Sequence, residues 1–70
     1  MESKQNNKLG IKIKSLRQKA GLSQDELARK SDVAYTTLTK VETGIIKSPS
    51  VFVIAKIAKS LGVSVDELIS

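Results

Sequence analysis

Two short helical segments with almost nothing between them, in residues 22–44, most constrain the fold of this chain. Each segment has about eight residues, whereas an isolated helix shorter than roughly 12–15 residues is at best marginally stable in water. Packing against the rest of the chain must therefore hold the two at a fixed angle. The 70 residues include no cysteine and no histidine, so disulfides and the usual zinc ligand sets are excluded. We expect neither a metal site nor a cofactor.

Apolar spacing predicts a helix before these two segments. Its inner stripe falls at i, i+4, i+7 and i+11 and stops before Gly21. The stripe consists of Leu9, Ile13, Leu16 and Ala20. The polar, aperiodic residues before it predict a flexible arm over residues 1–8, and the folded domain is expected over residues 9–70.

The second helix opens with a capping box, in which the side chains of Ser23 and Glu26 each bond the backbone N–H of the other residue. Asp32 ends this helix at a tight turn, where aspartate tolerates a left-handed backbone better than most residues do. Val33 is expected to lie beneath the turn as an apolar anchor. The inner face of the helix carries Leu27, Ala28 and Ser31.

The third helix is predicted from about Tyr35 to Glu42, with Leu38 and Val41 facing inward and Gly44 as its C-cap. Residues 44–50 are expected to form a loop.

Pro49 suits the first turn of a fourth helix, which stops at Gly62. Ser64 and Glu67 form a second capping box and open a short fifth helix with Leu68 and Ile69 on its inner side. The inward residues expected in the fourth helix are Val51, Ile54, Ala55, Ala58 and Leu61. Because no segment alternates with period two for long enough to form a sheet, the chain is predicted to be all-α.

The charge distribution makes a polyanion a plausible partner, although surface lysines also serve solubility. The formal net charge is +5, and Glu2 is the one acidic residue in residues 1–20. The same stretch holds these basic residues: Lys4, Lys8, Lys12, Lys14, Arg17 and Lys19. The apolar runs are too short for a membrane span, and no apolar core of a signal peptide is visible. We therefore expect a cytoplasmic protein.

The outward face of the third helix is chemically suited to reading base edges. Four residues form its single stripe: Tyr35, Thr36, Thr39 and Lys40. A helix about 10–12 Å across fits a major groove about 12 Å wide. Lysine can donate to guanine, and threonine can bond a base or lay its methyl group against a thymine methyl. On these residues alone, an ordinary solvated face remains the alternative.

A set of positions spread over all five helices resembles the Cro/phage-repressor type of helix-turn-helix domain, the XRE-type family. The resemblance covers roughly residues 9–69 and implies a compact five-helix, lambda-repressor-like fold, with helices two and three as the helix-turn-helix. The matching positions are Leu22-Ser23-Gln24, Glu26-Leu27-Ala28, Leu38, Lys40, Glu42, Gly44, Pro49, Ala58, Leu61-Gly62-Val63 and Asp66-Glu67-Leu68.

The resemblance also implies roles for individual residues. The outward stripe of helix three becomes the base-reading surface, and Gln24 matches a glutamine set against the DNA backbone. Arg17 and Glu42 match an ion pair that bridges helix one to the end of helix three, and Arg17 is also a candidate phosphate contact. Three further phosphate contacts are expected: Thr43, Lys47 and Ser48.

Some positions depart from the family pattern. Ala34 stands where a capping Ser or Thr is usual, a loss of about 1 kcal/mol in helix stability, and Asp32 replaces the common glycine. Several apolar residues stand where polar ones are more common, and they either complete a small core or form a dimer or partner face. These are Ile11, Ile45, Ile46, Phe52 and Val53, with Ile69 added for the partner face.

The leading hypothesis is a bacterial or phage, nucleoid-associated regulator that binds double-stranded DNA as a homodimer and acts as a repressor at a roughly palindromic site. The alternative is an antitoxin-like regulator whose main surface binds a protein partner such as a toxin. An enzyme is the least favoured class, because no catalytic constellation is visible. The acidic pairs Asp25-Glu26 and Asp66-Glu67 are explained by helix N-termini, where negative charge is favourable.

Overall fold

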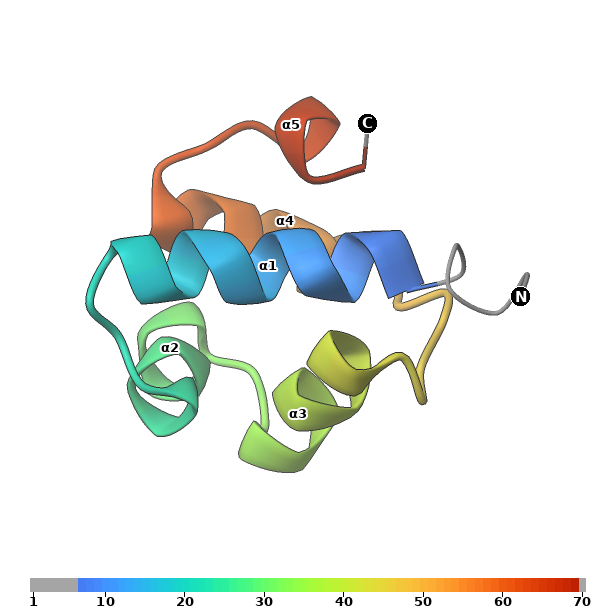
Figure 1. The fold of residues 1–70 in the computed structure, drawn as a ribbon, viewed down its shortest axis with the longest axis horizontal. Helices are drawn as coiled ribbons and strands as arrows, with labels where there is room; N and C mark the ends of the chain where they lie inside the picture. The colour runs from blue at the N-terminus through green and yellow to red at the C-terminus, as the bar shows by residue number, and fades with distance from the viewer. Residues whose placement is uncertain (1–6, 70) are drawn as a thin grey trace.

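The computed structural model describes residues 7–69, which form five α-helices and no strand (Figure 1). They are α1 (Lys8–Lys19), α2 (Gln24–Ser31), α3 (Tyr35–Thr43), α4 (Val51–Leu61) and α5 (Val65–Ile69). The prediction of an all-α domain of five helices is confirmed. The arm predicted over residues 1–8 falls mostly outside the described residues. Lys8 already belongs to α1, and the Asn7 side-chain amide donates to the Glu42 carbonyl at 3.3 Å.

Helix α1 crosses the middle of the molecule, with α2 and α3 on one side of it and α5 on the other (Figure 1). It packs against α3, α4 and α5, while α2 packs against α3 and α4. The two short helices of residues 22–44 therefore rest on a platform made by the longer helices α1 and α4. Within residues 7–69, no helix is long and apolar enough to cross a membrane.

The centre of the core is formed by side chains from the four longest helices. The largest fully buried ones are Ile13, Leu27, Leu38, Val41 and Ile57. Leu68 adds the contribution of α5 and is 2% exposed, whereas Ile69 is 57% exposed. Burying one such aliphatic side chain contributes about 1.5–3 kcal/mol. Since no disulfide is possible, this shared core is what holds the short helices in place.

The predicted inner face of α4 was partly wrong. Val51 is 61% exposed and Ala55 is exposed, whereas Ile57, which the prediction missed, is completely buried. Apolar residues occur nearly all the way around α4, so spacing alone does not determine which side faces the core. The helix begins at Val51, directly after the loop expected over residues 44–50, and Ser50 is its N-cap and accepts from the Val53 N–H at 3.2 Å. Pro49 therefore precedes the helix and does not lie in its first turn.

The capping box predicted for α5 is present. The Ser64 hydroxyl accepts from the Glu67 N–H at 3.1 Å, and the Glu67 carboxylate accepts from the Ser64 N–H at 3.4 Å. Such reciprocal bonds satisfy backbone donors that the first helical turn would otherwise leave without a partner. They allow a helix of five residues to be positioned precisely enough for Leu68 to reach the core.

The predicted stripe of α1 was incomplete, because Ala20 is exposed while Gly10 and Arg17 are buried. Gly10 marks the point of closest approach between α1 and the end of α3. A Cβ atom at this position would lie 2.3 Å from the Val41 carbonyl oxygen and 2.6 Å from the Glu42 carbonyl oxygen. Both neighbours are backbone atoms of a packed helix, so moving either of them would disturb the packing of α3. Gly10 thus sets the distance between α1 and α3.

We predict that Gly10→Ala lowers the free energy of unfolding by about 1–3 kcal/mol, the usual cost of overpacking. The sign of this change tests the close approach of α1 and α3, because alanine in place of glycine inside a helix ordinarily stabilises the protein by about 0.5–1 kcal/mol. Urea denaturation measures the change, with Ser15→Ala, at an exposed position of the same helix, as the control. Unchanged or increased stability of Gly10→Ala would contradict the close approach.

Candidate nucleic-acid interface

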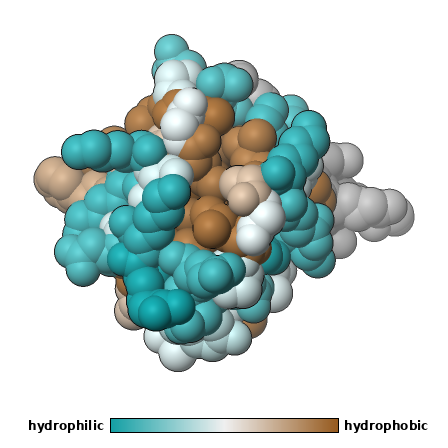
Figure 2. Space-filling model, turned by 90° about the vertical axis from the view of Figure 1, so that its left-hand side faces the viewer, coloured by the Kyte–Doolittle hydropathy of each residue, from teal (hydrophilic) through white to brown (hydrophobic). Residues whose placement is uncertain are grey.

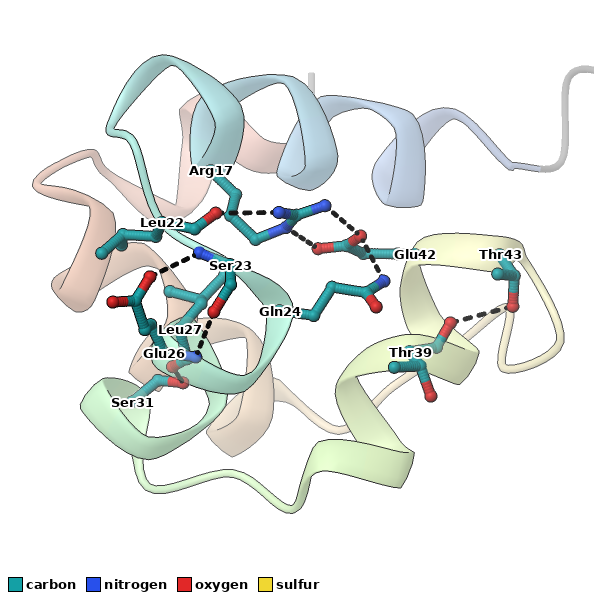
Figure 3. Close-up of polar contacts among 10 residues, drawn as sticks. All are labelled: Arg17, Leu22, Ser23, Gln24, Glu26, Leu27, Ser31, Thr39, Glu42 and Thr43. Atoms are coloured by element: carbon teal, nitrogen blue, oxygen red, sulfur yellow. Dashed lines mark hydrogen bonds and ion pairs between the residues drawn. The ribbon is translucent and has the colours of Figure 1, made fainter.

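The start of α2 is fixed by the predicted capping box (Figure 3). The Ser23 hydroxyl accepts from the Glu26 N–H at 3.0 Å, and the Glu26 carboxylate accepts from the Ser23 N–H at 2.8 Å. This backbone hydrogen bond is the main reason why the pKa of Glu26 lies below its ordinary value of 4.5, and the Ser23 side chain lowers the pKa further. The capping box places Gln24, the first residue of α2, at a defined position.

The turn between α2 and α3 is tight because Asp32 adopts a left-handed conformation, with φ 59° and ψ 44°. The expectation for this residue is confirmed. The Val33 N–H donates to the Ala28 carbonyl at 2.9 Å, and the Val33 side chain packs against the core as the expected anchor. Helix α3 follows after Ala34, which provides no side-chain cap. The α2–α3 pair is therefore held by its turn and by packing.

A buried polar network joins the end of α3 to α1 and to the start of α2 (Figure 3). The Arg17 guanidinium donates to the Glu42 carboxylate through Nε at 2.7 Å and through Nη2 at 3.1 Å. Its Nη1 donates to the Leu22 carbonyl at 2.8 Å. The Gln24 side-chain amide donates to the same carboxylate at 3.0 Å. One carboxylate thus gathers hydrogen bonds from two other segments of the chain.

The expected ion pair between Arg17 and Glu42 is present, with side chains only 9% and 2% exposed. The further expectation that Arg17 contacts phosphate does not fit this geometry. Three of its N–H groups point to partners inside the protein, and the residue is buried. We therefore assign Arg17 to the support of α3. The Arg17–Leu22 and Gln24–Glu42 hydrogen bonds were not expected, and the second depends on how α2 and α3 meet in space.

The outward stripe expected on α3 is accessible for most of its length. Tyr35 is 50% exposed, Thr36 and Lys40 are exposed, and Thr39 is half-buried. Leu38 and Val41, on the opposite side of the same helix, belong to the core. The core therefore orients α3 so that a polar, positively charged stripe faces outward.

Two threonine hydroxyls of α3 already bond the helix backbone. The Thr39 hydroxyl donates to the Thr36 carbonyl at 3.0 Å. The Thr43 hydroxyl donates to the Thr39 carbonyl at 2.9 Å, as Figure 3 shows. Because a phosphate oxygen only accepts hydrogen bonds, Thr43 must release this bond before its hydroxyl can donate to the DNA backbone. That makes Thr43 the weakest of the expected phosphate contacts.

The connection after α3 folds back onto the end of the helix, since the Ile46 N–H donates to the Lys40 carbonyl at 3.0 Å. Lys47 and Ser48 follow this bend, and both are exposed. They remain candidates for phosphate contacts, together with Gln24, which is half-buried and keeps a second amide proton besides the one donated to Glu42.

The five residues expected at a partner face differ in exposure. Ile45 is 71%, Phe52 is 75% and Ile69 is 57% exposed. Ile46 and Val53 are half-buried and pack against the core, which fits the alternative that they complete the core. They fill space beneath the α3–α4 connection and the start of α4, which apolar composition alone did not distinguish from exposed positions.

An apolar area that the sequence did not indicate lies at the other end of the molecule, away from the α3–α4 connection (Figure 1, Figure 2). Figure 2 shows it as a brown hollow bordered by hydrophilic side chains. This end carries the α1–α2 and α4–α5 connections (Figure 1). Leu22 and Val63, one in each connection, are half-buried and pack against the core. Such residues complete the core and still leave apolar atoms in contact with water.

Two short helices joined by a tight turn, with the second exposing a polar stripe and burying its opposite side, define a helix-turn-helix protein. The model of the helix-turn-helix family matches residues 13–68. The chain belongs to this family, of the XRE type, as its sequence indicated. Among the described residues, no group of three or more acidic, histidine or cysteine side chains is placed to hold a metal ion.

Relatives of known structure and name support this assignment. The HTH-type transcriptional regulator SinR of Bacillus licheniformis is 36% identical over 62 residues, which are 89% of this chain and 56% of that protein. The crystal structure of SinR, the master regulator for biofilm formation, in complex with DNA is 35% identical with a TM-score of 0.86, covering 89% of this chain and 98% of that one. A SinR–SinI complex is also 35% identical, with a TM-score of 0.87, covering 89% of this chain and 60% of that one. The chain thus spans little more than half of the length of the full regulator.

We predict that Arg17→Ala and Glu42→Ala each lower the free energy of unfolding by about 3–5 kcal/mol, because each leaves a buried charge without its partner. The double variant should lose clearly less than the sum of the two single losses, which chemical denaturation measures. Arg29→Ala serves as the control, since the Asp25–Arg29 pair is exposed and is worth about 0.2–0.5 kcal/mol. Additive losses would show that the two charges do not interact.

We also predict a pH-dependent contribution from Glu26. Because folding lowers its pKa, the carboxylate stabilises the folded state above the unfolded pKa, and this stabilisation is lost as the pH falls through the folded pKa. Glu26→Gln does not titrate, so its stability should fall less than that of the wild type between about pH 5 and about pH 2. Thermal unfolding across this range is the measurement, and parallel curves would contradict the effect.

Proposed function

We propose that this chain is a sequence-specific regulator of transcription that binds double-stranded DNA, with α3 in the major groove. The observation that carries the proposal is the rigid presentation of Tyr35, Thr36 and Lys40 on a helix held by the core and by the Arg17–Glu42 pair. A base-reading helix has to keep its side chains in register with the base edges. The 35% identical SinR structure in complex with DNA supports the same use of the fold.

Phosphate contacts would set the position of the protein on the duplex. Gln24 lies at the N-terminus of α2, where backbone N–H groups and the helix dipole favour an anion. Lys47 and Ser48 extend the contact from the α3–α4 connection. The net charge of +5 supports attraction to the polyanion over longer distances.

The biological unit is proposed to be a homodimer that represses transcription from a roughly palindromic operator. Two copies would place their α3 helices about 34–36 Å apart, one helical turn of DNA. The exposed side chains of Ile45, Phe52 and Ile69 are candidates for an association surface, because exposed apolar residues often mark such sites. The apolar area of Figure 2, at the other end of the molecule, is a separate candidate. Bound to a chromosome, the protein would act in the cytoplasm at the nucleoid.

A second candidate is a regulator whose main role is to bind a protein partner, such as a toxin, while DNA binding serves autoregulation. The structure of SinR with SinI supports it, since a 35% identical regulator there associates with another protein. The high exposure of Ile45 and Phe52 favours it in this chain. No enzymatic activity is proposed.

The decisive experiment is selection of the purified protein on a random double-stranded DNA library at about 150 mM salt, followed by sequencing. At such ionic strength the affinity for non-specific DNA is weak, with a Kd of about 10⁻⁴–10⁻⁶ M, so enrichment requires recognition of a sequence. An enriched inverted repeat with half-sites one helical turn apart would support the dimeric regulator. Absence of enrichment with a folded protein would reject sequence-specific DNA binding, which both the dimeric repressor and the autoregulating candidate require.

We predict that Lys40→Ala and Gln24→Ala weaken binding in different ways. Loss of a lysine contact to guanine should cost about 1–3 kcal/mol and relax the preference at one base pair, whereas loss of a phosphate contact should weaken binding to all sequences alike. Titration on the selected operator and on single-base variants separates the two patterns. Lys59→Ala, which removes the same charge from an exposed position on α4, is the matched control. A uniform loss for Lys40→Ala would reassign that residue to the backbone.

A further inference from the structure

We propose that Thr39 reads DNA through its methyl group, by contact with the C5-methyl of a thymine, whereas Thr36 reads through its hydroxyl. The inference rests on the proposed function and adds the kind of base that one position of α3 selects. It assigns apolar contact to Thr39 and hydrogen bonding to Thr36, although the sequence alone does not distinguish the two threonines.

The geometry of Thr39 leaves its hydroxyl without a free proton. Its Oγ1 donates to the Thr36 carbonyl at 3.0 Å, inside the helix. The side chain is also half-buried, so its accessible surface is limited. While this bond persists, the hydroxyl offers only lone pairs, and the rest of the side chain is a methyl group. A guanine or adenine N7, a guanine O6 or a thymine O4 needs a donor and therefore cannot be read by Thr39.

Thr36 differs in the same structure. It is exposed, and within residues 7–69 no hydrogen bond uses its hydroxyl. Its carbonyl, in contrast, receives the Thr39 hydroxyl. The Thr36 hydroxyl is therefore free to donate to or accept from a base edge. Within one turn of α3, Thr36 thus offers a polar group to a base and Thr39 offers an apolar one.

Thymine is the base that fits the Thr39 methyl group. It is the only base with a methyl group in the major groove, and apolar contact with that group is how a threonine methyl distinguishes it. Removing a buried group of this size should weaken binding about fourfold. An amino group of adenine or cytosine is the competing partner, since either can donate to the hydroxyl lone pairs.

The test measures the Kd of the wild type and of Thr39→Val, Thr39→Ser, Thr36→Val and Thr36→Ser on the operator obtained by selection. Each thymine of a half-site is replaced in turn by uracil, which removes only the C5-methyl group. Thr39→Val retains a methyl group without a hydroxyl, and Thr39→Ser retains the hydroxyl without the methyl group. Thermal unfolding of each variant shows that the fold is preserved.

One thymine should be found whose replacement by uracil weakens the wild type and Thr39→Val about fourfold and leaves Thr39→Ser unaffected. At Thr36 the order should reverse, with Thr36→Val weakened roughly 2- to 10-fold and Thr36→Ser close to the wild type. Two results would overturn the inference and leave the proposed function standing. One is a loss of binding by Thr39→Val but not by Thr39→Ser, and the other is a G·C pair at the position that depends on Thr39. Failure to select any preferred site would overturn it together with the proposed function.

Discussion

The Glu42 carboxylate is the point on which the placement of the helix-turn-helix depends. It lies at the end of α3 and accepts hydrogen bonds from Arg17 of α1 and from Gln24 at the start of α2. A buried carboxylate without partners would cost several kcal/mol, so any movement of α3 that breaks these bonds is strongly opposed. Two helices that are too short to be stable alone are thereby fixed relative to each other and to the core.

The backbone of α1 imposes a second condition on the same contact. Gly10 allows the two helices to meet at a distance that no larger residue permits, and the Asn7 amide donates to the Glu42 carbonyl beside it. The end of α3 is therefore held by an ion pair, by a hydrogen bond from the Asn7 side chain to the Glu42 carbonyl and by close packing. Rigid support of this kind matters for a helix whose exposed stripe is proposed to match the base edges of DNA.

Helix boundaries were predictable from the sequence because they depend on local chemistry. The Ser23–Glu26 and Ser64–Glu67 boxes and the left-handed Asp32 act within a few residues of themselves, and all three were confirmed. The phase of α4 was not predictable in this way. Apolar residues surround that helix, so its packing partners decided that Ile57 is buried and Val51 is exposed. For the same reason, the sequence did not show whether Ile46 and Val53 pack against the core or are exposed.

By itself, the sequence determined that this chain is an all-α domain of five helices, where the capped helices α2 and α5 begin, and which family it resembles. These follow from capping, periodicity and motif spacing, which are local properties. Only the tertiary structure decided that Arg17 is buried in support of α3, that Gln24 joins the same carboxylate, and which apolar residues remain exposed. Such contacts join residues 18 and 25 positions apart, so they exist only once the helices have packed.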